Sequence, residues 1–86
     1  MEIRFSVDFR KRYNKLNGKV KKAFHQRLKL FTQDTHHLLL RDHTLSGKLQ
    51  RHRAFSVTGD IRVVYYIHNG IAYFVDIGTH NQVYGK

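Results

Sequence analysis

The sequence predicts a single α+β domain spanning residues 1–86, with two helices ahead of its main strands. Two observations lead to this fold class. Apolar residues recur every three to four positions between residues 6 and 33, which is the spacing of an amphipathic helix. After residue 48, three runs rich in β-branched and aromatic residues are separated by turn-forming pairs that contain glycine. A chain of 86 residues holds one modest core, so no second domain is expected.

The first third of the chain is predicted to hold one short strand and two basic helices. The strand covers residues 2–5, and the apolar positions favour helices over residues 6–16 and 19–33, with Asn17 and Gly18 at the turn between them. The outward helix faces carry basic residues with no acidic residue among them: Arg10, Lys11, Arg12, Lys15, Lys19, Lys21, Lys22, Arg27 and Lys29. Such a run is either a solvated helix face or a platform for a nucleic-acid backbone or an acidic protein.

The rest of the chain is predicted to form a loop and then three strands. The loop covers residues 34–48, and the leucines at positions 38–40 are expected to anchor it to the core. The strands cover residues 49–57, 60–68 and 71–78, where β-branched and aromatic residues dominate. The expected architecture is therefore a pair of helices covering one face of an antiparallel-rich sheet.

The pairs Thr58-Gly59 and Asn69-Gly70 are each predicted to be a two-residue hairpin loop, which fixes the strand register. The predicted core face then holds Ala54, Ile61, Val63, Tyr65, Ile67, Ala72 and Phe74. The opposite face holds Arg51, Arg53, Phe55, Asp60, Arg62, Tyr66 and Tyr73, and His80 is expected to emerge beside Asp60. A surface of arginines and aromatic rings suits single-stranded RNA, because guanidinium groups bind phosphate and rings stack on bases.

The composition indicates a polyanionic partner. The chain has 16 Lys and Arg residues against 6 Asp and Glu residues, a formal net charge of +10. Nucleic acid, an acidic protein and an anionic membrane surface all fit such a charge. There is no cysteine, which excludes disulfides and thiolate metal sites. The apolar runs are far shorter than the ~20 residues of a membrane span, so we expect a cytoplasmic protein that does not enter a membrane.

Three segments resemble a known family: Asp42–Gly47 (DHTLSG), Gly59–Tyr65 (GDIRVVY) and Gly78–Gly85 (GTHNQVYG). They are similar to the RelE/ParE superfamily of bacterial toxins, and most of all to its YafQ-like branch of ribosome-associated messenger endonucleases. The resemblance implies a microbial-RNase-like α+β fold and an antitoxin partner. It also implies cleavage of messenger RNA on the ribosome, beside 16S ribosomal RNA, and no cofactor.

Five residues match functional positions of that family. His43 matches the histidine of an Asp-His-x-Leu element, and His80 matches the histidine of Gly-Thr-His. Asp60 matches an acidic residue at the start of the central strand, and Arg62 matches the arginine of an Arg-x-Val-Tyr strand in other RelE-like toxins. Tyr84 stands where the family has a functional aromatic residue. The resemblance therefore marks these five residues as the candidate catalytic set.

The chemistry expected of this set is metal-free cleavage of RNA through attack of a ribose 2′-hydroxyl on the adjacent phosphate. We take His80 as the general acid and leave Asp60 and His43 as alternatives for the general base. Arg62 binds the phosphate, and Tyr84 stacks on a base or positions the 2′-hydroxyl. Further RNA-binding candidates are the basic residues Arg53, Arg51, Lys48, Lys19 and Lys22. The histidines match no metal-binding motif, so no metal is expected.

Two alternatives to an endonuclease remain open. A ParE-like toxin that poisons a topoisomerase such as gyrase would have the same fold and the same basic charge. A non-catalytic nucleic-acid-binding domain would bind RNA or DNA with steep salt dependence and leave it uncut. The second alternative is kept because the chain departs from the YafQ-like pattern at three positions: Ser56 replaces a histidine, Ile61 a tryptophan and Asp76 an arginine. Arg62 is the candidate that compensates for the missing arginine.

Overall fold

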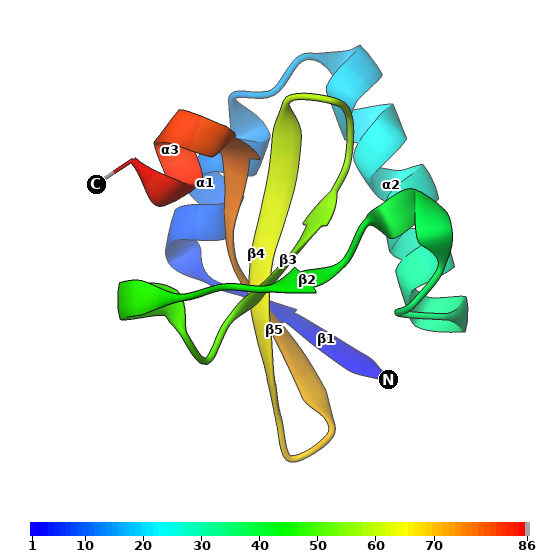
Figure 1. Cartoon of the computed structure of the whole chain (residues 1–86). Helices are drawn as coiled ribbons and strands as arrows, with labels where there is room; N and C mark the ends of the chain where they lie inside the picture. The colour runs from blue at the N-terminus through cyan, green and yellow to red at the C-terminus, as the bar shows by residue number, and fades with distance from the viewer. Residues whose placement is uncertain (86) are drawn as a thin grey trace.

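The computed structural model describes residues 1–85 and has the predicted α+β architecture (Figure 1). The elements are β1 (Glu2–Phe5), α1 (Val7–Asn14), α2 (Gly18–Gln33), the 3-10 turn η1 (Leu38–Leu40), β2 (His43–Thr44), the 3-10 turn η2 (Gly47–Leu49), β3 (Arg53–Ser56), β4 (Ile61–His68), β5 (Ile71–Thr79) and α3 (His80–Tyr84). The strand order is β1-β5-β4-β3-β2. Strand β1 runs parallel to β5, and the other neighbouring strands are antiparallel.

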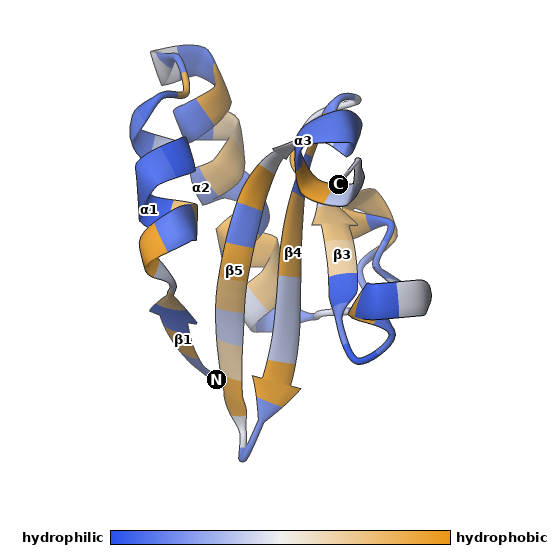
Figure 2. Cartoon of the chain, turned by 90° about the vertical axis from the view of Figure 1, so that its left-hand side faces the viewer, coloured by the Kyte–Doolittle hydropathy of each residue, from blue (hydrophilic) through white to orange (hydrophobic). Residues whose placement is uncertain are grey.

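Aromatic side chains form the core between the sheet and the helices α1 and α2. Phe9 of α1 and Phe31 of α2 are buried against Phe74 of β5 and Tyr65 of β4. The Phe31 ring centroid lies 4.9 Å from that of Tyr65 and 5.3 Å from that of Phe74. Figure 2 shows α1 and α2 together on one side of the strands and α3 at the end of β5. The predicted covering of one sheet face by two amphipathic helices is confirmed.

Each of these helices begins at a polar cap. The Ser6 side chain accepts a hydrogen bond from the Phe9 backbone N–H at 3.0 Å, and the Asn17 side chain accepts one from the Val20 N–H at 2.9 Å. Such side chains satisfy N–H groups that have no partner within the first turn. Helix α1 ends at Asn14, and Asn17 starts α2 three residues later.

Val57 donates a backbone hydrogen bond to the Ile61 carbonyl at 2.8 Å, which leaves a turn of three residues, 58–60, between β3 and β4, so the predicted two-residue loop is wrong. The Thr58 hydroxyl accepts hydrogen bonds from the backbone N–H groups of Asp60 and Ile61, which closes a turn of residues 58–60. Phe55 consequently pairs with Val63 rather than with Arg62. Because a shift of one residue reverses the faces of a strand, Phe55 lies in the core and Ala54 lies on the opposite face.

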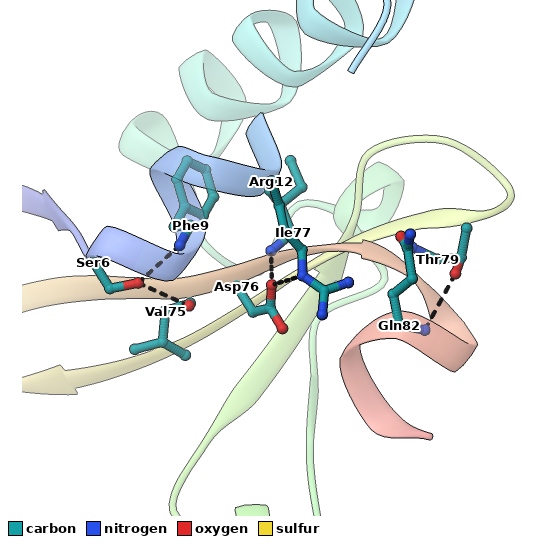
Figure 3. Close-up of polar contacts among 8 residues, drawn as sticks. All are labelled: Ser6, Phe9, Arg12, Val75, Asp76, Ile77, Thr79 and Gln82. Atoms are coloured by element: carbon teal, nitrogen blue, oxygen red, sulfur yellow. Dashed lines mark hydrogen bonds and ion pairs between the residues drawn. The ribbon is translucent and has the colours of Figure 1, made fainter. Parts of the chain in front are cut away.

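A β-bulge at Val75 corrects the predicted pairing of β4 with β5. Tyr65 pairs with Phe74 as the Asn-Gly hairpin predicts, but the next pair is Val64 with Asp76. The N-cap residue of α1 contacts the bulge, because the Ser6 hydroxyl donates a hydrogen bond to the Val75 carbonyl at 2.8 Å (Figure 3). One extra residue in a strand changes the face of every side chain after it. Asp76 therefore leaves the predicted core face.

Asp76 turns towards α1 and forms an ion pair there. The distance from Arg12 Nε to its Oδ1 is 3.1 Å, and both side chains are partly buried (Figure 3). The backbone N–H of Ile77 donates a hydrogen bond to the same oxygen at 2.9 Å. The bulge therefore gives a carboxylate in the middle of β5 two partners and joins the strand to α1.

The region 34–48 is more ordered than a loop, and the strand after it is shorter than predicted. Two 3-10 turns and the short strand β2 lie within or beside the region, and β3 begins only at Arg53. Leu40 alone among the three leucines is fully buried, whereas Leu38 is 89% exposed. Ile67, another predicted core residue, is 46% exposed near the end of the β4–β5 hairpin.

Within residues 1–85, no helix is both long enough and apolar enough to cross a membrane.

Candidate active site

A groove runs between β2, η2 and α3, where three of the five candidate catalytic residues and one RNA-binding candidate lie. It is a hollow of about 600 Å³ lined by polar groups of His43, Lys48, His80 and Tyr84. Leu45, Leu49 and Val83 supply apolar parts of its wall. We call this hollow the groove.

A second hollow, of about 390 Å³, lies at the other side of His80 and is lined by Asp60 and Arg62. The strand register brings these residues together, because Ile61 pairs with Thr79 and the next residue on each chain segment is Asp60 or His80. His80 therefore lies beside Asp60, as the sequence predicts. His80 lines both hollows and lies between the histidine of the groove and the carboxylate and guanidinium of the second hollow.

Helix α3 holds His80 at its first residue. The Thr79 side chain accepts a hydrogen bond from the Gln82 N–H at 3.2 Å, and the Gln82 side chain accepts one from the Thr79 N–H at 2.9 Å (Figure 3). This capping box fixes the direction in which the helix leaves β5. The imidazole of His80 packs edge-on against the Tyr84 ring, with centroids 4.6 Å apart. Residues four apart face the same side of a helix, so both side chains turn to the groove.

One ring nitrogen of His43 is engaged by the backbone. Its Nδ1 lies 3.0 Å from the Arg41 backbone carbonyl. A carbonyl oxygen only accepts hydrogen bonds, so Nδ1 carries the proton and donates it. Nε2 has no hydrogen-bond partner among residues 1–85, and the exposed side chain lines the groove.

Arg62 and Ser56 lie on the same face of adjacent strands. They are paired in the β3–β4 ladder, and Arg62 Nη1 donates a hydrogen bond to the Ser56 hydroxyl at 2.6 Å. This partner was not predicted, since sequence reasoning marked Ser56 only as a departure from the family pattern. A hydroxyl bound to one guanidinium nitrogen fixes the side chain and leaves other N–H groups to bind an anion.

The Tyr84 hydroxyl is buried and has no hydrogen-bond partner among the described residues. Burial raises the pKa of Tyr84 above its ordinary value, and the positive charge of Arg62 offsets part of this rise. The phenol is therefore a neutral donor at physiological pH. A buried polar group without a partner is unfavourable, whereas the ring of Tyr84 lines the groove beside His80.

The raised pKa of Tyr84 gives an expected dependence of stability on pH. The unfolded chain releases its phenolic proton near pH 10 and the folded chain at a higher pH, so this group stabilises the fold below pH ~10. Its contribution is lost as pH rises through the folded pKa. Urea unfolding at pH 9 and pH 11 measures the loss, and we expect a smaller loss in Tyr84→Phe. Equal losses in the two proteins would contradict the assignment.

The remaining RNA-binding candidates lie outside the two hollows. Arg53 shares the face of its ladder partner Tyr65, so the prediction that it shares the face of Arg62 is wrong, and its Nε lies 3.1 Å from Asp42 Oδ1. Arg51 precedes β3 and is exposed. Lys19 and Lys22 lie on α2 and line neither hollow.

Over residues 1–85, no three side chains of His, Asp or Glu converge in an arrangement able to hold a metal ion. The chain contains no cysteine to supply a thiolate. His36 and His37, which adjoin each other in sequence, lie just before η1, where the His37 side chain accepts a hydrogen bond from the Leu39 N–H.

Several solved structures share this fold, and toxins and toxin–antitoxin complexes are among them. YafQ from Escherichia coli strain BL21(DE3) has a TM-score of 0.80 at 24% sequence identity, with 98% of both chains covered. A YoeB/ParE toxin from Agrobacterium tumefaciens has a TM-score of 0.79 at 12% identity, over 93% of this chain and 99% of that one. The E. coli DinJ–YafQ toxin–antitoxin complex contains a chain with a TM-score of 0.70 at 20% identity, over 98% of this chain and 97% of that one.

The chain therefore has the fold of these toxin structures. The sequence matches over residues 1–85 the family described as bacterial toxin of type II toxin–antitoxin system, YafQ, so the chain belongs to the YafQ family of such toxins. No curated protein sequence matches it at a significant level.

Proposed function

We propose that this toxin cleaves messenger RNA on the ribosome by metal-free general acid–base catalysis. The observation that carries the proposal is the position of His80 between two hollows, with His43 and Tyr84 on one side and Asp60 and Arg62 on the other. Cleavage of this kind needs a base, an acid and a cation around one phosphate. The five side chains supply each of these groups.

Each residue has a role that follows from its environment. Nε2 of His43 takes the proton of the ribose 2′-hydroxyl, because its Nδ1 already donates to the Arg41 carbonyl. The 2′-oxygen then attacks the phosphorus, and Arg62 stabilises the charge that gathers on the phosphate oxygens. His80 gives its proton to the departing 5′-oxygen. The products are a 2′,3′-cyclic phosphate and a 5′-hydroxyl, so the numbers of protons and bonds balance.

Two residues support these steps without transferring a proton. The Tyr84 ring lines the groove beside His80 and stacks on a base of the RNA. Asp60 lines the second hollow together with His80 and Arg62 and orients the catalytic groups there. Asp60 remains the second candidate for the general base, since it lines the hollow beside Arg62.

The partners proposed for the chain follow from its charge and its family. Its net charge of +10 favours ribosomal and messenger RNA, with Lys48 lining the groove and Lys19, Lys22 and Arg51 exposed elsewhere on the surface. E. coli YafQ occurs in a toxin–antitoxin complex with DinJ. We propose that a cognate antitoxin of acidic character likewise binds this toxin, and that both proteins act in the cytoplasm.

A translating extract with one defined message tests the proposal. We expect the purified toxin to cut the message inside its reading frame and to leave 2′,3′-cyclic phosphate ends. Omitting ribosomes from the same mixture is expected to abolish cleavage. An uncut message together with topoisomerase-linked DNA breaks would overturn the proposal in favour of a ParE-like poison, and an uncut message that the protein binds with steep salt dependence would indicate a non-catalytic domain.

A further inference from the structure

The carboxylate of Asp42, the residue directly before His43, is held on both of its oxygens. Arg53 Nε donates to Oδ1 at 3.1 Å, and the Tyr65 hydroxyl donates to Oδ2. The Asp42 side chain is only 3% exposed, and Tyr65 is fully buried. Arg53 belongs to β3 and Tyr65 to β4, so these contacts tie the start of β2 to two central strands.

Strand β2 itself gives His43 little support. It has two residues, both exposed, and it lies at the edge of the sheet, where its pairs are His43 with Ala54 and Thr44 with Arg53. Strands in globular proteins are usually 3–10 residues long, so this ladder is shorter than an ordinary strand pair. Backbone pairing alone is a weak way to fix the direction of an exposed imidazole.

The contacts before β2 supply the missing restraint. Arg41 adopts a left-handed backbone conformation with φ 49°, and its carbonyl accepts the Nδ1–H of His43 at 3.0 Å. The backbone between Arg41 and His43 is thus held at one end by the imidazole and in the middle by the Asp42 carboxylate. A contribution to stability alone explains the arrangement poorly, because apolar replacements of a buried ion pair are often neutral or stabilising.

We propose that Asp42, Arg53 and Tyr65 form a clamp that positions His43 in the groove. They are positioning residues, because they act on the RNA only through His43. The inference rests on the proposed function in one respect, which is that His43 is the base that the clamp orients. The placing of the imidazole and its tautomer is a property of the free protein and is measured without RNA.

The protonation states of the clamp suit this role. Burial raises the pKa of the Tyr65 phenol well above its ordinary value, and the bond to Asp42 raises it further. Burial by itself lowers the pKa of Arg53, but the charge of Asp42 and the hydrogen bonds to Tyr65 and Asp42 together outweigh this effect, so the pKa is raised. Both donors therefore keep their protons across the physiological range.

The decisive variant is Tyr65→Phe, which removes one donor and keeps the ring that packs in the core. We expect imidazole nitrogen NMR to show loss of the single Nδ1–H tautomer at His43, and amide exchange at His43 and Thr44 to speed up by roughly 10-fold or more. The single-turnover rate of message cleavage is expected to fall by roughly 10- to 100-fold at saturating ribosomes, since a misplaced group loses rate rather than binding. Arg53→Lys is the second variant, and it is used if Tyr65→Phe fails to fold.

Tyr13→Phe is the matched control, because it also removes a tyrosine hydroxyl bond, here to His25 Nε2 at 2.7 Å on the helical side of the molecule. The control should leave the His43 signals and amide exchange as in the wild type. Unchanged His43 signals in Tyr65→Phe, or the same changes in both variants, would overturn the clamp. Altered His43 signals in a protein whose wild type cuts no message would support the clamp and overturn the proposed function.

Discussion

His80→Ala is expected to lower cleavage of a translated message by roughly 10²- to 10⁴-fold, which is the usual contribution of a positioned acid or base. Without the imidazole, the 5′-oxygen must depart unprotonated. The fold should not change, because His80 is exposed and the capping box of α3 uses Thr79 and Gln82 instead. We expect the free energy of unfolding to stay within about 0.5 kcal/mol of the wild type, as for other surface substitutions.

His68→Ala is the matched control for this experiment. His68 is also an exposed histidine, but it lies at the β4–β5 hairpin and lines neither hollow. Primer extension on the message measures cleavage, and thermal unfolding measures stability in the same preparations. Equal cleavage by His80→Ala and the wild type would remove His80 from the mechanism. Loss of both cleavage and stability in His80→Ala would assign it a structural role instead.

The secondary structure followed from local patterns, whereas the register did not. The helical spacing of apolar residues and the Asn-Gly turn depend only on residues that are close together in the chain. The helices α1 and α2 and the β4–β5 hairpin were therefore predictable. The three-residue turn depends on the Thr58 hydroxyl reaching two backbone N–H groups. The bulge at Val75 depends on Ser6, almost seventy positions away in the chain. A hydrophobic pattern contains neither of these tertiary contacts.

Those residues of the candidate site that belong to short sequence motifs were predictable. His80 and Asp60 follow from the ends of two paired strands, and His43 came from the family resemblance alone. Helix α3 was missed although Thr79-x-x-Gln82 is a capping-box signature in the sequence. The hydrogen-bond partners of Arg62 and Asp42 could not be predicted, because these contacts depend on the exact register of β3 against β4.

Phe31→Ala is expected to cost about 3–5 kcal/mol of the free energy of unfolding, the usual loss for a buried phenylalanine. Phe31 is 1% exposed and joins α2 to the sheet, with its ring 5.2 Å from that of Phe55 and 4.9 Å from that of Tyr65. The substitution leaves a cavity between the two layers that the rigid strands cannot close. Since a domain of this size is stable by only about 5–15 kcal/mol, a large share of its stability depends on this residue.

Thermal or urea unfolding measures the loss, and each kcal/mol lowers the Tm of such a domain by about 4–8 °C. Leu38→Ala is the control, because Leu38 is 89% exposed and its removal should change stability by less than about 0.5 kcal/mol. Phe31→Leu keeps part of the buried side-chain volume and should therefore be less destabilising than Phe31→Ala. If Phe31→Ala were no more destabilising than Leu38→Ala, α2 would not be packed on the sheet through this side chain. The Phe31 ring packs against Tyr65, and the Tyr65 hydroxyl donates to Asp42. Without this packing, the strands alone would have to hold the shape of the groove.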